Sequence, residues 1–254
     1  MAATSVSALY VPGSTKVHLL PAQVKVAGAI GFVFAVALTP REAFWAYALY
    51  AAAVGLVAAA AGLRPSLVIR RMAVEVPFVA FALLLPLVGQ GERMDVLGLS
   101  LSVAGLWAAW TILAKATLGV AVSVVLASTT PATQIVGGLE ALHVPRPFTA
   151  VMGFMLRYAD VLTDKIGAQR RAMAARGYDP RWFMQAKPLA VSAGTIFVRS
   201  YEQGERIQRA MIARGYAGAM PATRRQPATR SDWLTALAPA VGALIVALVS
   251  WRIL

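Results

Sequence analysis

Several long apolar runs with few charges constrain this chain more than any other feature. Of its 254 residues, 59% are hydrophobic and 14% are charged, whereas about a quarter of the residues are charged in an ordinary soluble domain. A deficit of charge that is spread over several such runs indicates an integral membrane protein. The sequence therefore predicts an all-α, polytopic membrane protein.

About five transmembrane helices are expected. They cover residues 24–38, 44–63, 73–88, 101–128 and 233–251. Arg64, Arg70 and Arg71 concentrate positive charge after the second span, so the positive-inside rule places that loop and the N-terminus in the cytoplasm and the C-terminus outside. The first 20 residues lack the pattern of a cleaved signal peptide, and the first span is expected to be retained.

The region between the fourth and fifth spans is strongly basic. From Arg157 to Arg230 it holds 14 of the 24 Lys and Arg residues but only five acids. Basic segments flanked by apolar spans belong on the cytoplasmic side. The expected organisation is a bundle of four spans in 1–128, a cytoplasmic helical domain in 129–231, and a final span in 232–254.

Two or three long helices are predicted in this cytoplasmic domain. Ala132–Leu142 follows a Thr-Pro start, and a helix of about 28 residues begins at Phe148, where apolar residues recur at helical spacing. Another runs from about Pro188 to Arg214. Its expected apolar face carries Ala193, Phe197, Ser200, Gly204, Ile207 and Met211. The small Ser200 and Gly204 would allow another helix to cross closely at this face.

A seven-residue phrase occurs at the end of both long helices. Residues 172–178 read Ala-Met-Ala-Ala-Arg-Gly-Tyr, and residues 210–216 differ from them at a single position. A glycine just past a helix end suits the left-handed cap, and an arginine there complements the helix dipole. Capping leaves the recurrence of Ala-Met and Tyr unexplained. An exposed arginine at a helix end is also suited to bidentate contact with a carboxylate, so capping and docking both remain open.

These endings resemble the Ala-Arg-Gly motifs of the T component of energy-coupling factor (ECF) transporters, bacterial ABC-type importers of micronutrients. Residues 154–158 and 197–206 are similar to the cobalt-type, or CbiQ-type, branch of that family. The resemblance implies a non-catalytic scaffold in the bacterial inner membrane. Its coupling helices would dock two cytoplasmic ATPases and pass their motion to a substrate-binding membrane subunit (S component). Cobalt is the implied substrate, and nickel or a vitamin (biotin, or a general ECF module) are the alternatives.

The resemblance assigns residues one by one. The ATPase-docking residues that it implies are Ala175, Arg176, Gly177, Ala213, Arg214 and Gly215. Structural or coupling roles are possible for Arg157, Arg199, Glu202, Glu205 and Arg206. The simpler interpretation, pairing of Glu202 with Arg206 and of Glu205 with Arg209 along one helix, is favoured for these charges.

Chemistry of other kinds has little support in the sequence. There is no cysteine, and the two histidines, His18 and His143, lie far apart and are expected in loops. No phosphate-binding loop, catalytic cluster or metal site is expected, so no cofactor is expected and ATP would be used by the partner ATPases. A membrane enzyme, the membrane subunit of an ordinary ABC importer and a nucleic-acid binder are less favoured alternatives.

Two charged residues fall in or near predicted spans, where a charge is costly. Glu75 is interpreted as snorkelling or as paired with a neighbouring arginine. For Lys115, a packing or pairing role is favoured over contact with substrate.

Overall fold

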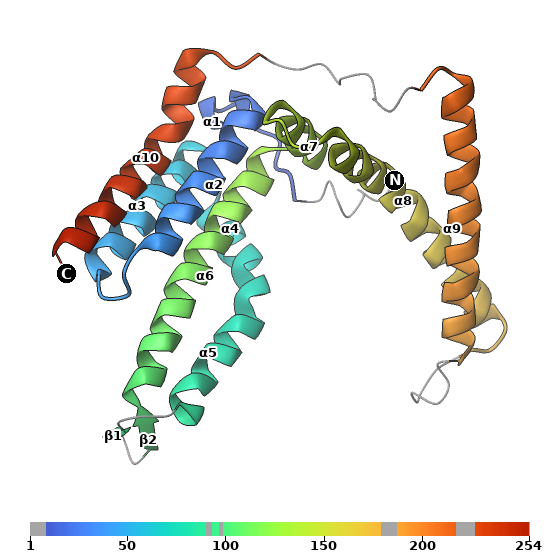
Figure 1. The fold of residues 1–254 in the computed structure, drawn as a ribbon. Coiled ribbons are helices and arrows are strands. Elements are labelled where there is room, and N and C mark those ends of the chain that lie inside the picture. Colours follow the sequence, from blue (N-terminus) through green and yellow to red (C-terminus); the bar gives the residue numbers. More distant parts are fainter. Residues whose placement is uncertain (1–8, 90–92, 97–98, 179–186, 217–226, 254) are drawn as a thin grey trace. The chain divides into compact units, whose positions relative to one another are not determined.

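The computed structural model describes residues 9–89, 93–96, 99–178, 187–216 and 227–253. These residues are mostly helical and divide into two compact units, of which one contains α8 and α9 and the other, the bundle, contains the remaining elements (Figure 1). In chain order the elements are α1 (Lys16–Leu19), α2 (Ala22–Leu38), α3 (Phe44–Ala60), α4 (Pro65–Met72), η1 (Ala73–Glu75), α5 (Val76–Val88), β1 (Arg93–Val96), β2 (Leu99–Ser102), α6 (Val103–Thr129), α7 (Ala132–Ala141), α8 (Arg146–Ala175), α9 (Lys187–Ala213) and α10 (Arg230–Ile253).

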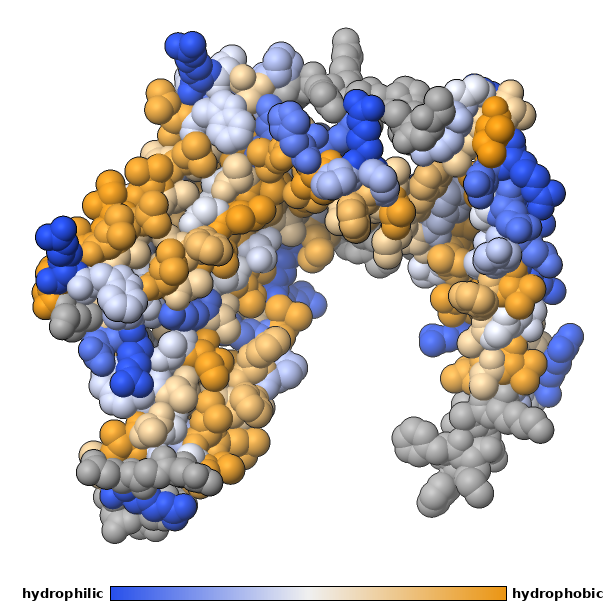
Figure 2. All heavy atoms as spheres, viewed as in Figure 1, coloured by the Kyte–Doolittle hydropathy of each residue, from blue (hydrophilic) through white to orange (hydrophobic). Residues whose placement is uncertain are grey.

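The bundle has the dimensions of a membrane domain. Among the described residues, Pro65–Val88, Val103–Thr129 and Arg230–Ile253 are long and apolar enough to cross a membrane. The helices α2 and α3 are apolar and 17 residues long, about 25 Å at 1.5 Å per residue. Hydrophobic side chains cover much of the bundle surface in view (Figure 2). The predicted all-α, polytopic membrane fold is confirmed.

Close packing of α2 against α10 depends on small residues. A Cβ atom on Gly28 would lie 2.5 Å from the main-chain oxygen of Ala236, and one on Gly31 would lie 3.3 Å from the Cβ of Ala240. Small residues at a helix interface let two backbones approach in the membrane. Glycine at position 28 therefore sets the distance between these two helices.

The core between α2, α3 and α10 contains a buried polar link. The Tyr50 hydroxyl donates to the main-chain oxygen of Ala243 at 3.0 Å and lies 2.9 Å from the Thr39 hydroxyl. The ring of Tyr50 packs edge-on against Phe32, with 5.7 Å between ring centres. Because its hydroxyl is hydrogen-bonded, Tyr50 can be fully buried at low cost.

Side chains from three other helices close the C-terminal end of α2. The last carbonyls of a helix lack partners within the helix, and in lipid each must find one. The three donor–acceptor pairs are Lys115 Nζ to Ala37 O at 2.7 Å, Trp251 Nε1 to Leu38 O at 2.8 Å, and Tyr47 Oη to Thr39 O at 3.3 Å. Lys115 therefore has a packing role within this chain, as favoured from the sequence, because a cation suits a helix C-terminus.

The predicted loop before the third span is partly helical. Pro65 starts α4 at the first helical position, which suits proline, and one 3-10 turn, η1, joins α4 to α5. Arg70 and Arg71 thus lie on a helix and not in a loop. The guanidinium of Arg71 donates to Ser128 Oγ at 2.6 Å and to Leu9 O, which ties the start of the chain to the end of α6.

Glu75 lies in η1 and does not snorkel. Its side chain is 5% exposed, and its carboxylate accepts a hydrogen bond of 2.6 Å from Thr117 Oγ1 on α6. The partner found among the described residues is a hydroxyl and not the neighbouring arginine that the sequence suggested. Glu75 thus fixes the 3-10 turn to the middle of α6.

A short hairpin replaces part of the predicted loop between the third and fourth spans. The strands β1 and β2 are antiparallel, and Arg93 pairs with Ser102 while Val96 pairs with Leu99. The alternation Leu-Ser-Leu-Ser in 99–102 is a strand signal. The prediction from the sequence instead included residues 101 and 102 in the span 101–128. The Ser102 side chain accepts from Gly105 N at 3.3 Å and so sets the start of α6.

We expect Gly28→Ala to destabilise the bundle by about 1–3 kcal/mol, because an added methyl group would overlap a main-chain atom of α10. The measurement is the melting midpoint of the purified chain in detergent. Gly55→Ala on α3 is the control, since no atom lies within 4 Å of a Cβ at that position. Equal midpoints for the two variants would contradict this account of the α2–α10 contact.

Candidate functional site

The helix α8 ends in a cap built from its own main chain. Tyr178 N donates to Met173 O at 3.1 Å, and Gly177 N donates to Ala174 O at 2.9 Å. Gly177 has a φ of 78°, in the left-handed region that favours glycine. This pair of hydrogen bonds, with a left-handed residue just past the helix end, defines a Schellman cap.

The helix α9 ends in the same way. Tyr216 N donates to Met211 O at 3.0 Å, Gly215 N donates to Ile212 O at 3.0 Å, and Gly215 has a φ of 83°. The two copies of the repeated phrase therefore form two copies of one cap. Corresponding residues of the two caps are 38 positions apart in the sequence.

The cap involves the Met and Tyr of the repeated phrase as well as its glycine. In each copy, Tyr and Met are the two residues joined by the cap hydrogen bond that spans six residues, from Tyr178 to Met173 and from Tyr216 to Met211. A hydrophobic contact between these positions commonly accompanies it. The cap thus offers a reason for the recurrence of Met and Tyr, whereas the recurrence of the Ala before Met stays unexplained by it.

The cap does not require the side chains of the two arginines, because its hydrogen bonds are all made by the main chain. Arg176 and Arg214 donate through their main-chain N–H groups to Met173 O and Met211 O. Both side chains are exposed, and their guanidinium groups have no hydrogen-bond or ion-pair partner among the residues that the structure describes. Two rigid helix ends therefore each present a free guanidinium, held by an identical turn.

The two helix ends lie far apart within their unit because α8 and α9 run antiparallel. Lys165 Nζ on α8 donates to Gln203 Oε1, and Ser192 at the start of α9 lies 3.3 Å from Met173 Sδ near the end of α8. Arg176 is therefore near the beginning of α9 and Arg214 at its other end. A helix of 27 residues measures about 40 Å, which sets the scale of their separation.

The row of α9 that faces α8 overlaps only in part with the apolar face predicted from the sequence. Its half-buried residues recur at helical spacing and include both residues that bond α8; they are Ser192, Ile196, Ser200, Gln203, Ile207 and Met211. Phe197 is 72% exposed, Ala193 is exposed as well, and no atom outside the helix lies within 4 Å of a Cβ on Gly204. Ser200, Ile207 and Met211 of the predicted face thus belong to the row toward α8, whereas Gly204 does not contact α8, and a close crossing there by another helix stays a prediction.

Both helices also expose apolar residues. On α8 they include Phe148, Val151 and Met155, and on α9 they include Val191, Phe197, Val198, Tyr201 and Ile212. These α9 residues lie outside the row that faces α8. Exposed apolar faces of this kind mark interaction or membrane surfaces.

The other charged residues singled out in the sequence lie on these two helices. Arg206 is 3.9 Å from Glu202, and Arg209 is 3.0 Å from Glu205, both one helical turn apart. The predicted intrahelical pairs are confirmed, and such exposed pairs are worth only a few tenths of a kcal/mol. Arg157 and Arg199 are exposed on α8 and α9, and their roles stay predictions.

The histidines are not gathered into a site. His18 lies in α1, where Nε2 is 3.1 Å from Val11 O and Nδ1 is 2.7 Å from the Thr15 hydroxyl. His143 follows α7 with a φ of 64°. No group of three or more potential metal ligands occurs among the described residues.

Comparisons with known proteins agree with the resemblance seen in the sequence. The model of the family CbiQ, cobalt transport protein, matches residues 13–226. A protein of Methanocorpusculum labreanum, named as a fused cobalt transport protein CbiMQ, is 26% identical over 145 residues, which are 55% of this chain and 24% of that protein. The chain thus matches about a quarter of the length of this curated relative.

Replacing a cap glycine should loosen the helix end. In Gly177→Ala, a left-handed alanine costs roughly 1–2 kcal/mol, so we expect the Tyr178 amide to exchange hydrogen about five- to thirtyfold faster. Gly194→Ala within α9 is the control, because a Cβ there meets open space. Unchanged exchange at Tyr178 in Gly177→Ala would show that the left-handed turn does not hold this end.

Proposed function

We propose that this chain, which belongs to the CbiQ family of cobalt transport proteins, is the transmembrane scaffold of an ECF-type importer. The observation that carries the proposal is the pair of identical helix caps, each with a free guanidinium, at opposite ends of the α8–α9 pair. Two equal groups on one chain suit two equal partners. The family makes the chain a transporter component; its place in the complex is our inference.

The proposed partners of Arg176 and Arg214 are two cytoplasmic ATPase subunits. An arginine inserted into an acidic groove can bind a carboxylate through two parallel hydrogen bonds. The caps support this use, since their main-chain bonds keep each arginine at a defined position without engaging its side chain. ATP would be bound and hydrolysed by the partners, and this chain would need no cofactor of its own.

The proposed mechanism is the transmission of motion. If ATP binding draws two ATPases together, and each holds one helix end, α8 and α9 must shift against each other. The described polar contacts between the two helices include a hydrogen bond from Lys165 to Gln203, and such a shift would have to break or re-form it. The displacement would then be passed to the spans and to a substrate-binding membrane subunit.

The exposed apolar rows of α8 and α9 support a membrane partner. Phe148, Met155 and Phe197 are each more than 60% exposed, and contiguous exposed apolar faces mark protein or membrane interaction sites. The fused CbiMQ relative joins a CbiM part to a CbiQ part by its name. A separate S component of the CbiM kind would be the corresponding partner of this chain.

Cobalt is the proposed substrate, on the strength of the family. The measurement is uptake of labelled Co²⁺ by cells that express the complete transporter. Competition by Ni²⁺, or uptake of a vitamin without uptake of Co²⁺, would move the assignment to the alternatives.

The proposed location is the bacterial inner membrane with a cytoplasmic N-terminus. In this orientation the four spans of 1–128 are followed by the cytoplasmic segment 129–231 and by the final span of 232–254. Because the sequence has no cysteine, single cysteines can test it. We expect Glu42→Cys to react with a membrane-impermeant thiol reagent in intact cells and Gln208→Cys to react only after lysis. The reverse pattern would overturn the orientation.

Loss of either docking arginine should weaken ATPase association. Truncating one partner of a buried charge pair costs about 2–5 kcal/mol, so Arg176→Ala or Arg214→Ala should raise the apparent Kd for the ATPases by at least about tenfold. Membrane insertion should be unchanged. The measurement is co-purification of the ATPases, together with coupled uptake.

Arg170→Ala is the matched control, because Arg170 is an exposed arginine on the same helix but outside the cap. It should leave both measurements unchanged. Normal ATPase recovery and normal uptake in the Arg176→Ala, Arg214→Ala double variant would refute the docking role.

A further inference from the structure

A cavity of about 170 Å³ lies within the bundle. It is found where α2 and α10 begin and where α3 and α6 end. Its wall is formed by Val17, Leu20, Lys25, Gly28, Ala29, Phe32, Ala53, Val54, Val57, Val122, Val125, Leu126, Thr129, Thr235, Ala236 and Pro239. The cavity belongs to none of the surfaces proposed above for the ATPases or for the S component.

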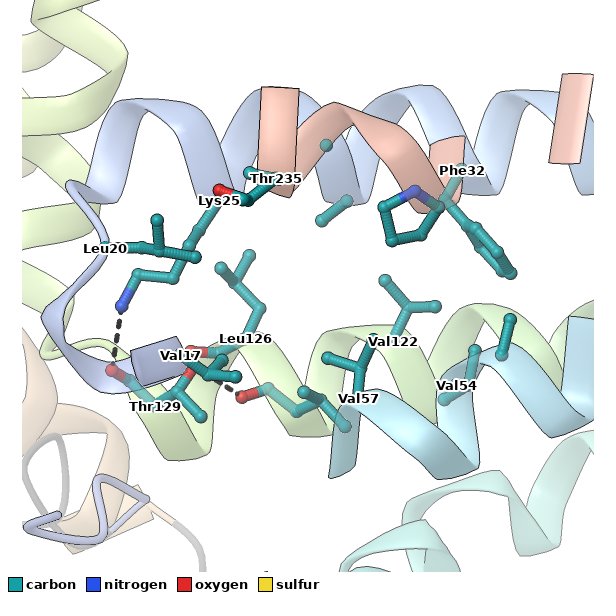
Figure 3. Close-up of a pocket in the computed structure, with 16 residues that line it drawn as sticks. Val17, Leu20, Lys25, Phe32, Val54, Val57, Val122, Leu126, Thr129 and Thr235 are labelled. Carbon is teal, nitrogen blue, oxygen red and sulfur yellow. Dashed lines mark hydrogen bonds between the residues drawn. The ribbon is translucent and has the colours of Figure 1, made fainter. Parts of the chain in front are cut away.

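The cavity has one polar end and one apolar end. Lys25 and Thr129 lie together at one end, and Phe32 and Val54 lie at the other (Figure 3). Between them the wall is formed almost entirely by aliphatic side chains. A molecule that fits this arrangement has a charged or polar head and an apolar chain.

The charge at the polar end is not neutralised by an acid. Lys25 is 8% exposed, and its ammonium donates to the main-chain oxygens of Thr129 at 3.1 Å and His18 at 3.3 Å. No carboxylate lies within ion-pair distance of it among the described residues. An ammonium has three donors, so one remains for a further acceptor.

Closing the end of α6 is one function of Lys25, since a cation suits a helix C-terminus. That role does not require a cavity beside the ammonium. It also leaves a buried charge with only partial compensation, and burying a charge is costly unless it is paired. The cavity and the unpaired charge together indicate a bound anion that carries an apolar chain.

We propose that this cavity binds an anionic phospholipid, with the phosphate at Lys25 and the first part of one acyl chain along the apolar wall. Lipid is the occupant that the location favours, because the surrounding helices are membrane helices. An apolar cavity of about 150 Å³ can hold a benzene-sized molecule, so this one has room for a short segment of chain. A soluble anion would leave the apolar end unfilled.

The test is native mass spectrometry of the purified full-length chain in micelles that contain equal amounts of phosphatidylglycerol and phosphatidylcholine. A basic residue near the membrane surface favours an anionic lipid about fivefold, so we expect the wild type to retain phosphatidylglycerol in about that excess. Lys25→Met should abolish the preference and Lys25→Arg should preserve it. Glycerol phosphate in excess should not displace the lipid.

Two further variants separate this site from general charge and from loss of fold. Lys16→Met removes an exposed lysine of α1 at the same end of the bundle and should keep the preference. Ala53→Leu keeps Lys25 but fills the cavity, and should lose the retained lipid. The proposal is overturned if the wild type shows no preference, if Ala53→Leu retains phosphatidylglycerol as the wild type does, or if glycerol phosphate competes.

Discussion

The architecture depends on the need of every main-chain carbonyl in lipid for a donor within the protein. At the end of α2 that need is met by Lys115, Trp251 and Tyr47 from three different helices. At the end of α6 it is met by Lys25. These bonds let a helix of 17 residues end beside longer ones, and they explain why two lysines occur inside apolar helices.

The helices α8 and α9 satisfy the carbonyls of their last turns in a different way. Their ends are closed by main-chain bonds around Gly177 and Gly215, with no side-chain donor needed. The side chains of the adjacent Arg176 and Arg214 therefore close no helix end by hydrogen bonds, in contrast to those of Lys25 and Lys115. This feature connects the structure with the proposed function, because a guanidinium that forms no hydrogen bond among the described residues is available to bind a partner.

Periodicity and composition were sufficient to predict the membrane class, the long helices and both helix ends. They failed where a long-range contact decides the outcome. The sequence placed Phe197 and Gly204 on the apolar face of α9 without saying which helix that face meets. The row that packs on α8 contains Ser192 and Gln203 instead, since two neighbouring rows on one helix look alike without the partner. The hairpin at 93–102 was missed because its apolar residues merge with the following span. The hydroxyl partner of Glu75 lies 42 positions away on α6, too far for any local pattern to reveal.

By itself, the sequence determined that the chain enters a membrane and that two helices end in the same turn. These properties are local, since hydropathy, charge and a left-handed glycine act over one helix or less. Only the tertiary structure decided that α8 and α9 run antiparallel, that their two arginines lie at opposite ends of the pair, and that Lys25 borders a cavity. Such properties depend on which residues meet from distant parts of the chain, and packing alone selects those pairs.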